Sequence, residues 1–153
     1  MIDHPVPELA LPSTGGKTVR FSELRGSPFV LYFYPKDNTP GCTTEGQNFR
    51  DLHPQFTDVG WRIFGVSRDS IKSHESFKTK MSFPFELLSD QDEKACSAFA
   101  VIKMKNMYGR QVRGIERSTF AVDAAGIVRG QWRGVKVPGH AQEVLDFVKS
   151  LSA

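Results

Sequence analysis

The chain has little cysteine: Cys42 and Cys96 are the only two in 153 residues. So few thiols exclude a small disulfide-rich scaffold, which depends on several cysteine pairs. Neither cysteine belongs to a CxxC motif, and this argues against a dithiol oxidoreductase. We therefore expect a cytoplasmic location, where thiols stay free unless chemistry oxidises them.

Long hydrophobic runs are also missing. The longest, residues 29–34, is far too short to cross a bilayer. The first twelve residues, "MIDHPVPELALP", contain acidic residues and three prolines where a signal peptide needs basic residues and an unbroken apolar stretch. We expect no association with a membrane.

Strong charge and metal-binding patterns are absent as well. The net charge is only +3, and the basic residues are scattered, with residues 103–113 as their closest approach to a cluster. A solvated basic face explains such a distribution better than a nucleic-acid surface does. The histidines, His4, His53, His74 and His140, are dispersed, so no metal cluster is expected, and His53 is interpreted as a surface residue of a helix.

What is present is a regular alternation of strand and helix patterns. With 39% hydrophobic residues, the 153 residues suit one domain with a continuous core. Two hairpins are predicted, at residues 9–24 with a turn at Gly15-Gly16 and at residues 118–132 with a turn at 123–126. Buried strands are predicted at 29–34, 61–67 and 85–90, and helices from about 42, at 70–81, 92–101 and 140–151. This order predicts an α/β fold with a largely parallel centre and a mixed sheet.

The stretch "YPKDNTPGCTTEG" places Cys42 where a proline-rich loop enters a helix. Backbone N–H groups at a helix start lack partners and the helix dipole is positive there, and both effects favour a thiolate over a thiol. Pro35 and Pro40 stiffen the loop, and the hydroxyl of Thr39 can turn toward the sulfur or toward an oxygen bound beside it. A cysteine that merely fills space at a buried helix start is the alternative.

Pro35, Thr39 and Cys42 match the proline–threonine–cysteine signature of peroxiredoxins. The segment "YPKDNTPGCTTEGQNFRD" resembles the bacterioferritin comigratory protein, or peroxiredoxin Q, subfamily in particular. A second segment, "KNMYGRQVRGIERSTFAVD", is similar to that subfamily's second signature and puts Arg117 in the position of its active-site arginine. The resemblance covers nearly the whole chain.

This resemblance implies a thioredoxin-like fold, with a central mixed β-sheet flanked by helices and an N-terminal hairpin, formed by residues 1–153 as a single domain. It implies reduction of hydrogen peroxide and organic hydroperoxides with no metal or organic cofactor. Thioredoxin, glutaredoxin or a low-molecular-weight thiol would serve as reductant. We expect a monomer, because members of the subfamily are often monomeric.

The chemistry assigns roles to these residue types. The thiolate of Cys42 would attack one oxygen of the peroxide, and negative charge would grow on the other. The Thr39 hydroxyl, the Arg117 guanidinium and the N–H groups of Gly41 and Cys42 are the candidate donors to both oxygens. Glu45, one turn into the helix, either anchors Arg117 or is a favourable acid near the helix N-terminus.

Arg117 has a less specific interpretation, as a surface partner of its neighbour Glu116. Alternation along a strand would place the two side chains on opposite faces of the sheet, which weakens that interpretation.

The chain departs from its family at the resolving cysteine. Many members carry one five residues after the nucleophile, where this chain has Gln47, and others carry one near Lys78. Cys96 remains, on a helical face with Phe99 and Ala100 that points into the core, so it is either structural, as we favour, or a resolving thiol. The favoured mechanism therefore uses one cysteine and an external thiol. A redox-sensing or holdase-type binding protein, switched by oxidation of Cys42, is the alternative function.

Overall fold

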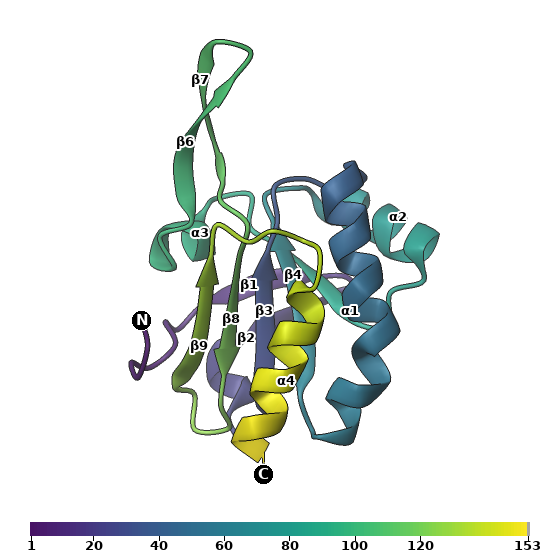
Figure 1. Cartoon of the computed structure of the whole chain (residues 1–153), viewed down its shortest axis with the longest axis vertical. Helices are drawn as coiled ribbons and strands as arrows, with labels where there is room; N and C mark the ends of the chain where they lie inside the picture. Colours follow the sequence, from purple (N-terminus) through teal and green to yellow (C-terminus); the bar gives the residue numbers. More distant parts are fainter. Residues whose placement is uncertain (153) are drawn as a thin grey trace.

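A mixed β-sheet forms the centre of the structure, a computed structural model that describes residues 1–152 (Figure 1). Its strands are β1 (Ala10–Ser13), β2 (Lys17–Arg20), β3 (Phe29–Phe33), β4 (Arg62–Ser67), β5 (Glu86–Ser89), β8 (Ser118–Val122) and β9 (Val128–Arg133). Within residues 1–152 these seven strands are ordered β2-β1-β5-β4-β3-β8-β9. β3, β4 and β5 run parallel, whereas β8 is antiparallel to β3, so the mixed sheet expected from the sequence is confirmed.

The sheet has a hydrophobic core on each face, and β3 supplies both. Val30 and Tyr32 belong to one buried cluster, and Phe29, Leu31 and Phe33 belong to the other. Successive side chains of a strand point to opposite faces, so a strand buried on both sides must be apolar throughout. This explains the unbroken "FVLYFY" of the sequence.

Different helices cover the two faces. α1 (Pro40–Asp58), α2 (Ile71–Met81) and α4 (His140–Ser152) contribute buried side chains to the cluster that contains Val30. The short helices η1 (Phe21–Leu24) and α3 (Lys94–Ala98) contribute to the cluster on the opposite face. In Figure 1, α4 and α1 lie in front of the sheet. No helix among residues 1–152 combines the length and the apolar character needed to cross a membrane.

α1 begins slightly earlier than the sequence suggested. Its first residue is Pro40, whose fixed φ suits the first helical position and whose missing N–H would have no partner there. Thr39 precedes it in an extended conformation. Phe49 and Phe56 face the core as predicted, and the helix continues past Pro54 to Asp58.

Within residues 92–115 one prediction was wrong, and one element was not predicted. The helix expected over 92–101 is limited to α3, because Glu93 before it and Ala100 after it adopt left-handed backbone conformations. The following stretch, read from sequence only as scattered basic charge, is a hairpin of β6 (Ile102–Met107) and β7 (Arg110–Ile115). Tyr108 and Gly109 both have positive φ at its turn, and the hairpin projects from the body (Figure 1).

Candidate active site

Cys42 is the third residue of α1 and is almost fully buried, with 2% of its surface exposed. The helix has 19 residues, and the loop that follows β3 leads directly into its N-terminus. Nη2 of Arg117 lies 3.5 Å from Sγ of Cys42 and donates to it. The helix start and a guanidinium therefore reach the same sulfur, and both stabilise negative charge on it.

Arg117 joins two groups that are 72 and 75 residues away in the sequence. Besides the sulfur, its guanidinium contacts Glu45, with Nη1 2.6 Å from Oε1. Arg117 lies in the link between β7 and β8, so the strand alternation assumed for Arg117 and Glu116 was wrong. Of the two roles left open for Glu45, the geometry shows the contact with the arginine. Burial opposes the charge of Arg117, but Glu45 and Cys42 outweigh it and raise the pKa of Arg117.

Gly41 allows the guanidinium to approach the loop. A Cβ atom at this position would lie 3.2 Å from Nη2 of Arg117, closer than ordinary van der Waals contact. A larger residue would require the guanidinium to shift by a few tenths of an ångström. The sequence marked Gly41 as a source of an N–H donor, and the structure adds this steric role.

Glu45 is a buried carboxyl with one satisfied oxygen. Its side chain is 1% exposed, and Oε2 has no hydrogen-bond partner. Burial raises the pKa of Glu45 to about 7, even though the charge and hydrogen bond of Arg117 act in the opposite direction. Near neutral pH the carboxyl therefore exchanges between a form that offsets the charge of Arg117 and a neutral form that leaves this charge facing the sulfur.

Thr39 and Pro35 shape the loop without contacting the sulfur through any described hydrogen bond. Oγ1 of Thr39 donates to the carbonyl of Lys36 at 2.8 Å, so its hydrogen is not free to turn toward the sulfur as the sequence suggested. Its oxygen lone pairs can still accept the O–H of a peroxide. Pro35 is half-buried where the loop leaves β3.

A buried polar network, which the sequence analysis missed, holds this loop. Asp37 is in the loop and accepts from the hydroxyl of Tyr34 at 2.6 Å and that of Ser73 at 2.7 Å. Nδ1 of His74 lies 2.8 Å from the same carboxyl, and Nε2 lies 2.9 Å from the carbonyl of Leu88. A carbonyl can only accept, so Nε2 carries a hydrogen and Nδ1 is the nitrogen that faces Asp37.

Asp69, in the loop that follows β4, completes the network. Its Oδ2 accepts from the backbone N–H of Asp37 at 2.9 Å and from the hydroxyl of Ser67 at 2.5 Å. Asp37, Asp69 and His74 are the group among residues 1–152 that most resembles a set of metal ligands, but hydrogen bonds within the protein engage their polar atoms. No spacing in the sequence indicates this network, because Asp37 lies 32 residues from Asp69 and 37 from His74. His74 therefore has a structural role that its isolated position in the sequence does not indicate.

Cys96 lies on the other side of the sheet. It belongs to the cluster with Leu31 and Phe33, whereas Cys42 belongs to the cluster with Tyr32. Its side chain is 0% exposed, as expected from its helical face. Burial first, and then the carboxylate of Asp90, raise the pKa of Cys96 far above its usual range. A strand of the central sheet therefore separates the two thiols.

The two positions where the sequence resemblance led us to look for a resolving cysteine are occupied by side chains with other partners. Nε2 of Gln47 lies 3.8 Å from the sulfur of Met81, and Nζ of Lys78 pairs with Glu86 at 3.0 Å. Neither position supplies a thiol near Cys42.

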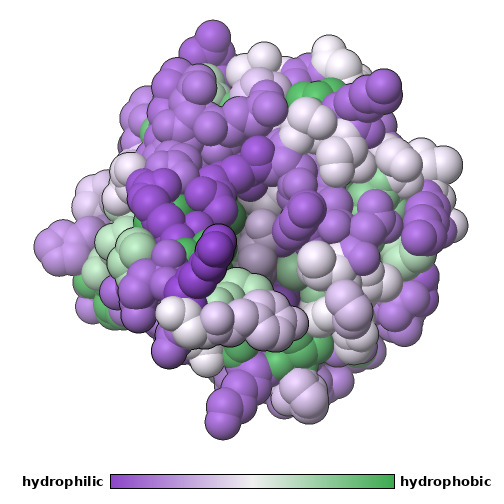
Figure 2. Space-filling model, turned by 90° about the horizontal axis from the view of Figure 1, so that it is seen from above, coloured by the Kyte–Doolittle hydropathy of each residue, from purple (hydrophilic) through white to green (hydrophobic). Residues whose placement is uncertain are grey.

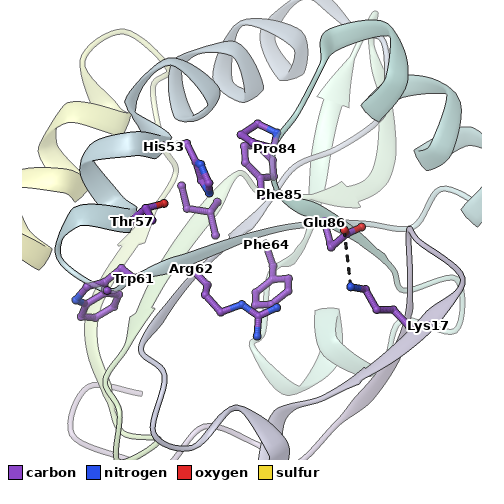
Figure 3. A pocket seen from close by; sticks show the side chains of 11 residues that line it. Lys17, His53, Thr57, Trp61, Arg62, Phe64, Pro84, Phe85 and Glu86 are labelled. Carbon is purple, nitrogen blue, oxygen red and sulfur yellow. Dashed lines mark ion pairs between the residues drawn. The ribbon is translucent and has the colours of Figure 1, made fainter.

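A separate hollow of about 310 Å³ lies away from these residues (Figure 3). It is lined by His53, Trp61, Phe64 and Phe85, among others, and Cys42, Thr39 and Arg117 are not part of it. His53 is half-buried there and burial lowers its pKa, and its partly exposed position on α1 agrees with its interpretation as a surface residue of a helix. This hollow has no part in the chemistry at the sulfur.

The AhpC/TSA family model matches residues 2–131, and the chain belongs to this family. Within the family, its relatives are peroxiredoxins of the Bcp and Q group. The chain is 54% identical over 143 residues to peroxiredoxin Bcp of Xanthomonas campestris, covering 94% of this chain and 89% of that protein. It is 46% identical over 151 residues to peroxiredoxin Bcp of Bacillus subtilis, covering 99% and 96%.

Solved structures agree with these relatives. The bacterioferritin comigratory protein of Xanthomonas campestris, studied for alkyl peroxide reduction, superposes with a TM-score of 0.90 at 52% identity, covering 95% of this chain and 92% of that one. A cysteine-to-serine variant of PrxQ from Xylella fastidiosa gives a TM-score of 0.95 at 46% identity, covering 100% and 98%. The resemblance drawn from the two sequence signatures is confirmed: the fold is the thioredoxin-like fold of peroxiredoxins, and the protein is a thiol-dependent peroxidase.

Proposed function

We propose that Cys42 is the peroxidatic nucleophile of a one-cysteine peroxidase that reduces hydrogen peroxide and organic hydroperoxides. The observation that supports this proposal most is the Arg117 guanidinium, which bridges Glu45 and the sulfur at the start of α1. The reduction of alkyl peroxides by the Xanthomonas relative supports organic hydroperoxides as substrates. The reaction needs no metal or organic cofactor, because the thiol supplies the electrons.

The first step oxidises the sulfur. The thiolate of Cys42 attacks one oxygen of the peroxide R′OOH, the O–O bond breaks, and the products are a sulfenic acid, Cys42–SOH, and R′O⁻. A proton from solvent converts R′O⁻ to R′OH. The thiolate loses two electrons and the peroxide gains them.

Charge on the departing oxygen is stabilised by donors that are already in place. Arg117 lies 3.5 Å from the sulfur, and the N–H groups of the first turn of α1, including those of Gly41 and Cys42, are candidate donors because a helix start leaves them without partners within the helix. Thr39 accepts the peroxide O–H and so orients the oxygen to be attacked. Donors fixed in advance are usually the largest catalytic term, and removal of one costs about 2.7–4 kcal/mol.

The second stage restores the thiol from outside the chain. A thiol R″SH converts Cys42–SOH to a mixed disulfide and releases water, and a second thiol releases R″S–SR″ and free Cys42. The reductant is a protein such as thioredoxin or glutaredoxin, or a small thiol. Cys96 is unsuited to this step because it is buried behind the sheet and bears a strongly raised pKa. We therefore assign it a structural role.

The same proposal extends to the setting of the enzyme. Two buried free cysteines suit a reducing compartment, which supports a cytoplasmic location. One sheet with a hydrophobic core on each face supports treating residues 1–153 as one peroxiredoxin domain. We expect this domain to act as a monomer.

A pair of variants tests the proposal. Cys42→Ser should abolish peroxide consumption with dithiothreitol as reductant while the circular dichroism spectrum stays unchanged, since serine is nearly isosteric. Cys96→Ser should keep multiple turnovers. After one equivalent of peroxide, mass spectrometry of the wild type should show one added oxygen, and excess peroxide should give sulfinic acid. A stoichiometric bridge between the two cysteines, lost together with turnover in Cys96→Ser, would show that the mechanism uses two cysteines.

A further inference from the structure

The hairpin of β6 and β7, residues 102–115, is an unusual surface, which we call the arm. It pairs only with itself among the described strands and projects beyond the sheet (Figure 1). It carries four of the six large hydrophobic side chains that are exposed within residues 1–152: Met104 (61%), Met107 (49%), Tyr108 (100%) and Val112 (40%). An isolated two-stranded hairpin is marginally stable in water, and clustered exposed apolar residues mark interaction sites.

The arm is also positively charged. Residues 102–115 include Lys103, Lys105, Arg110 and Arg113 and no aspartate or glutamate. Arg113 pairs with Glu93, and Lys105 donates to the carbonyl of Ile115. Lys103 and Arg110 have no ion pair with the residues that the structure describes, so their charge is available to a partner. Seen from above, hydrophilic residues dominate the end of the molecule from which the arm projects, with hydrophobic ones between them (Figure 2).

The base of the arm adjoins the active site. β7 ends at Ile115, which is fully buried, and Arg117 follows two residues later. Burial and the nearby charge of Arg117 lower the pKa of Lys105, which places this side chain within electrostatic reach of the site. A partner bound at the base of the arm would therefore lie close to Arg117 and Cys42.

We propose that the arm is the docking surface for a protein thiol reductant whose surface around its reactive thiol is acidic. This inference rests on the proposed function, because a one-cysteine peroxidase needs an external thiol that approaches Cys42. Arginine, methionine and tyrosine are enriched at the cores of protein interfaces, and methionine adapts its shape to a partner. The unpaired cations select an acidic partner, and they disfavour a second copy of the arm, which carries the same charge.

The docked reductant carries out the exchange already described. Its thiol attacks the sulfur of Cys42–SOH, water leaves, and a mixed disulfide joins the two proteins. A second thiol of the reductant then attacks the reductant's sulfur in the mixed disulfide. The reductant leaves with an internal disulfide, and Cys42 is released as a thiolate. The arm forms no bond in this sequence and affects only how often the thiol reaches the sulfur.

Two arm variants and one control test the inference. Lys103→Glu/Arg110→Glu reverses the unpaired charge, and Met107→Ser/Tyr108→Ser removes the apolar tip. The control, Arg25→Glu/Arg62→Glu, makes the same change in net charge before β3 and at the first residue of β4, at the ends of these strands away from the Cys42 loop. Each full-length protein is assayed for oxidation of Cys42 by hydrogen peroxide in a single turnover, and for reduction by dithiothreitol and by an acidic thioredoxin kept reduced by its reductase.

Both arm variants should lower kcat/KM for thioredoxin by about ten-fold or more, whereas the other two rates stay unchanged. Raising the salt concentration should slow thioredoxin turnover of the wild type and of the control, but not of the charge-reversed arm. Unchanged kcat/KM for thioredoxin in both arm variants would overturn the inference. So would a wild-type dimer in sedimentation that the tip variant dissociates, because the arm would then bind a second copy. Wild type that fails to turn over even with dithiothreitol would instead reject the proposed function.

Discussion

Cys42 and Cys96 occupy the same local position in two different regions of the molecule. Each is the third residue of a helix, and each is almost completely buried. At Cys42 the helix has 19 residues and a guanidinium lies 3.5 Å from the sulfur. At Cys96 the helix has five residues, and its first N–H groups are taken by the carboxylate of Asp90.

A helix start does not by itself stabilise a thiolate, because the groups around it can add either positive or negative charge. A negative group at the N-terminus of α3 uses the donors that a thiolate would need and repels its charge. A positive group delivered from a distant part of the chain does the opposite at α1. The tertiary structure therefore decides which of the two sulfurs has a cation beside it and which has a carboxylate.

Removing Arg117, the positive partner of Cys42, should have the largest effect on the rate of the peroxide step. Arg117→Ala leaves the start of α1 intact but removes the guanidinium, so we expect the second-order rate of the peroxide step to fall by about 10²–10³. Arg117→Lys should recover only part of this loss, since a point charge cannot hold both oxygens as a planar fork does. Stopped-flow measurement of sulfenic acid formation checks this. A rate in Arg117→Ala within two-fold of wild type would leave the helix start as the sole activator.

Loosening the loop should have the next largest effect. Asp37→Asn weakens the network that holds the Cys42 loop against β4 and α2, and small displacements of reacting groups are costly, so we expect a ten- to hundred-fold slower peroxide step. Ser73→Ala is the milder variant, because it removes a single hydrogen bond of about 1 kcal/mol. Reduction of the pre-formed sulfenic acid by dithiothreitol should be unchanged in a folded Asp37→Asn protein. Equal losses in both steps would indicate general destabilisation instead of loop positioning.

Changing Glu45 should alter the pH dependence of stability. Burial raises its folded pKa from 4.5 to about 7, so the folded protein binds this proton more tightly than the unfolded chain does. Stability should therefore fall as the pH rises from about 4.5 to about 7, by on the order of 3 kcal/mol from this group. Glu45→Gln should flatten that fall, measured as the free energy of unfolding in urea at pH 5 and pH 8. Glu143→Gln, at an exposed carboxyl, is the control and should leave the slope unchanged.

The smallest effect should come from the opposite side of the sheet. Asp90→Asn removes the negative partner of Cys96, but burial is the larger cause of its raised pKa and remains. We expect Cys96 to stay unlabelled by iodoacetamide during the time in which Cys42 is fully labelled, followed by peptide mass spectrometry. Labelling of Cys96 at a rate close to that of Cys42 would mean that charge, and not burial, protects it.

Elements whose patterns are local could be predicted from the sequence alone. The continuous apolar run of β3, the helical spacing of Phe49 and Phe56 and the prolines before Cys42 each carry their own signal over a few residues. From these came the α/β order, the place of the thiol at a helix start and, through the two signatures, the family. Cys96 was also predicted to face the core, because a helical face can be read from spacing alone.

The contacts between distant parts of the chain could be known only from the tertiary structure. Residues tens of positions apart meet where Arg117 pairs with Glu45 and in the network around Asp37 and His74. The same folding places β3 between the two cysteines. The arm gave no clear signal either, because only Ile102 and Ile115 at its base pack against the core, and the remaining side chains lack the apolar alternation that reveals a strand. Periodicity reports which side of an element is buried, but not which distant group it meets, and at Cys42 that distant group is the Arg117 guanidinium, which stabilises negative charge on the buried sulfur.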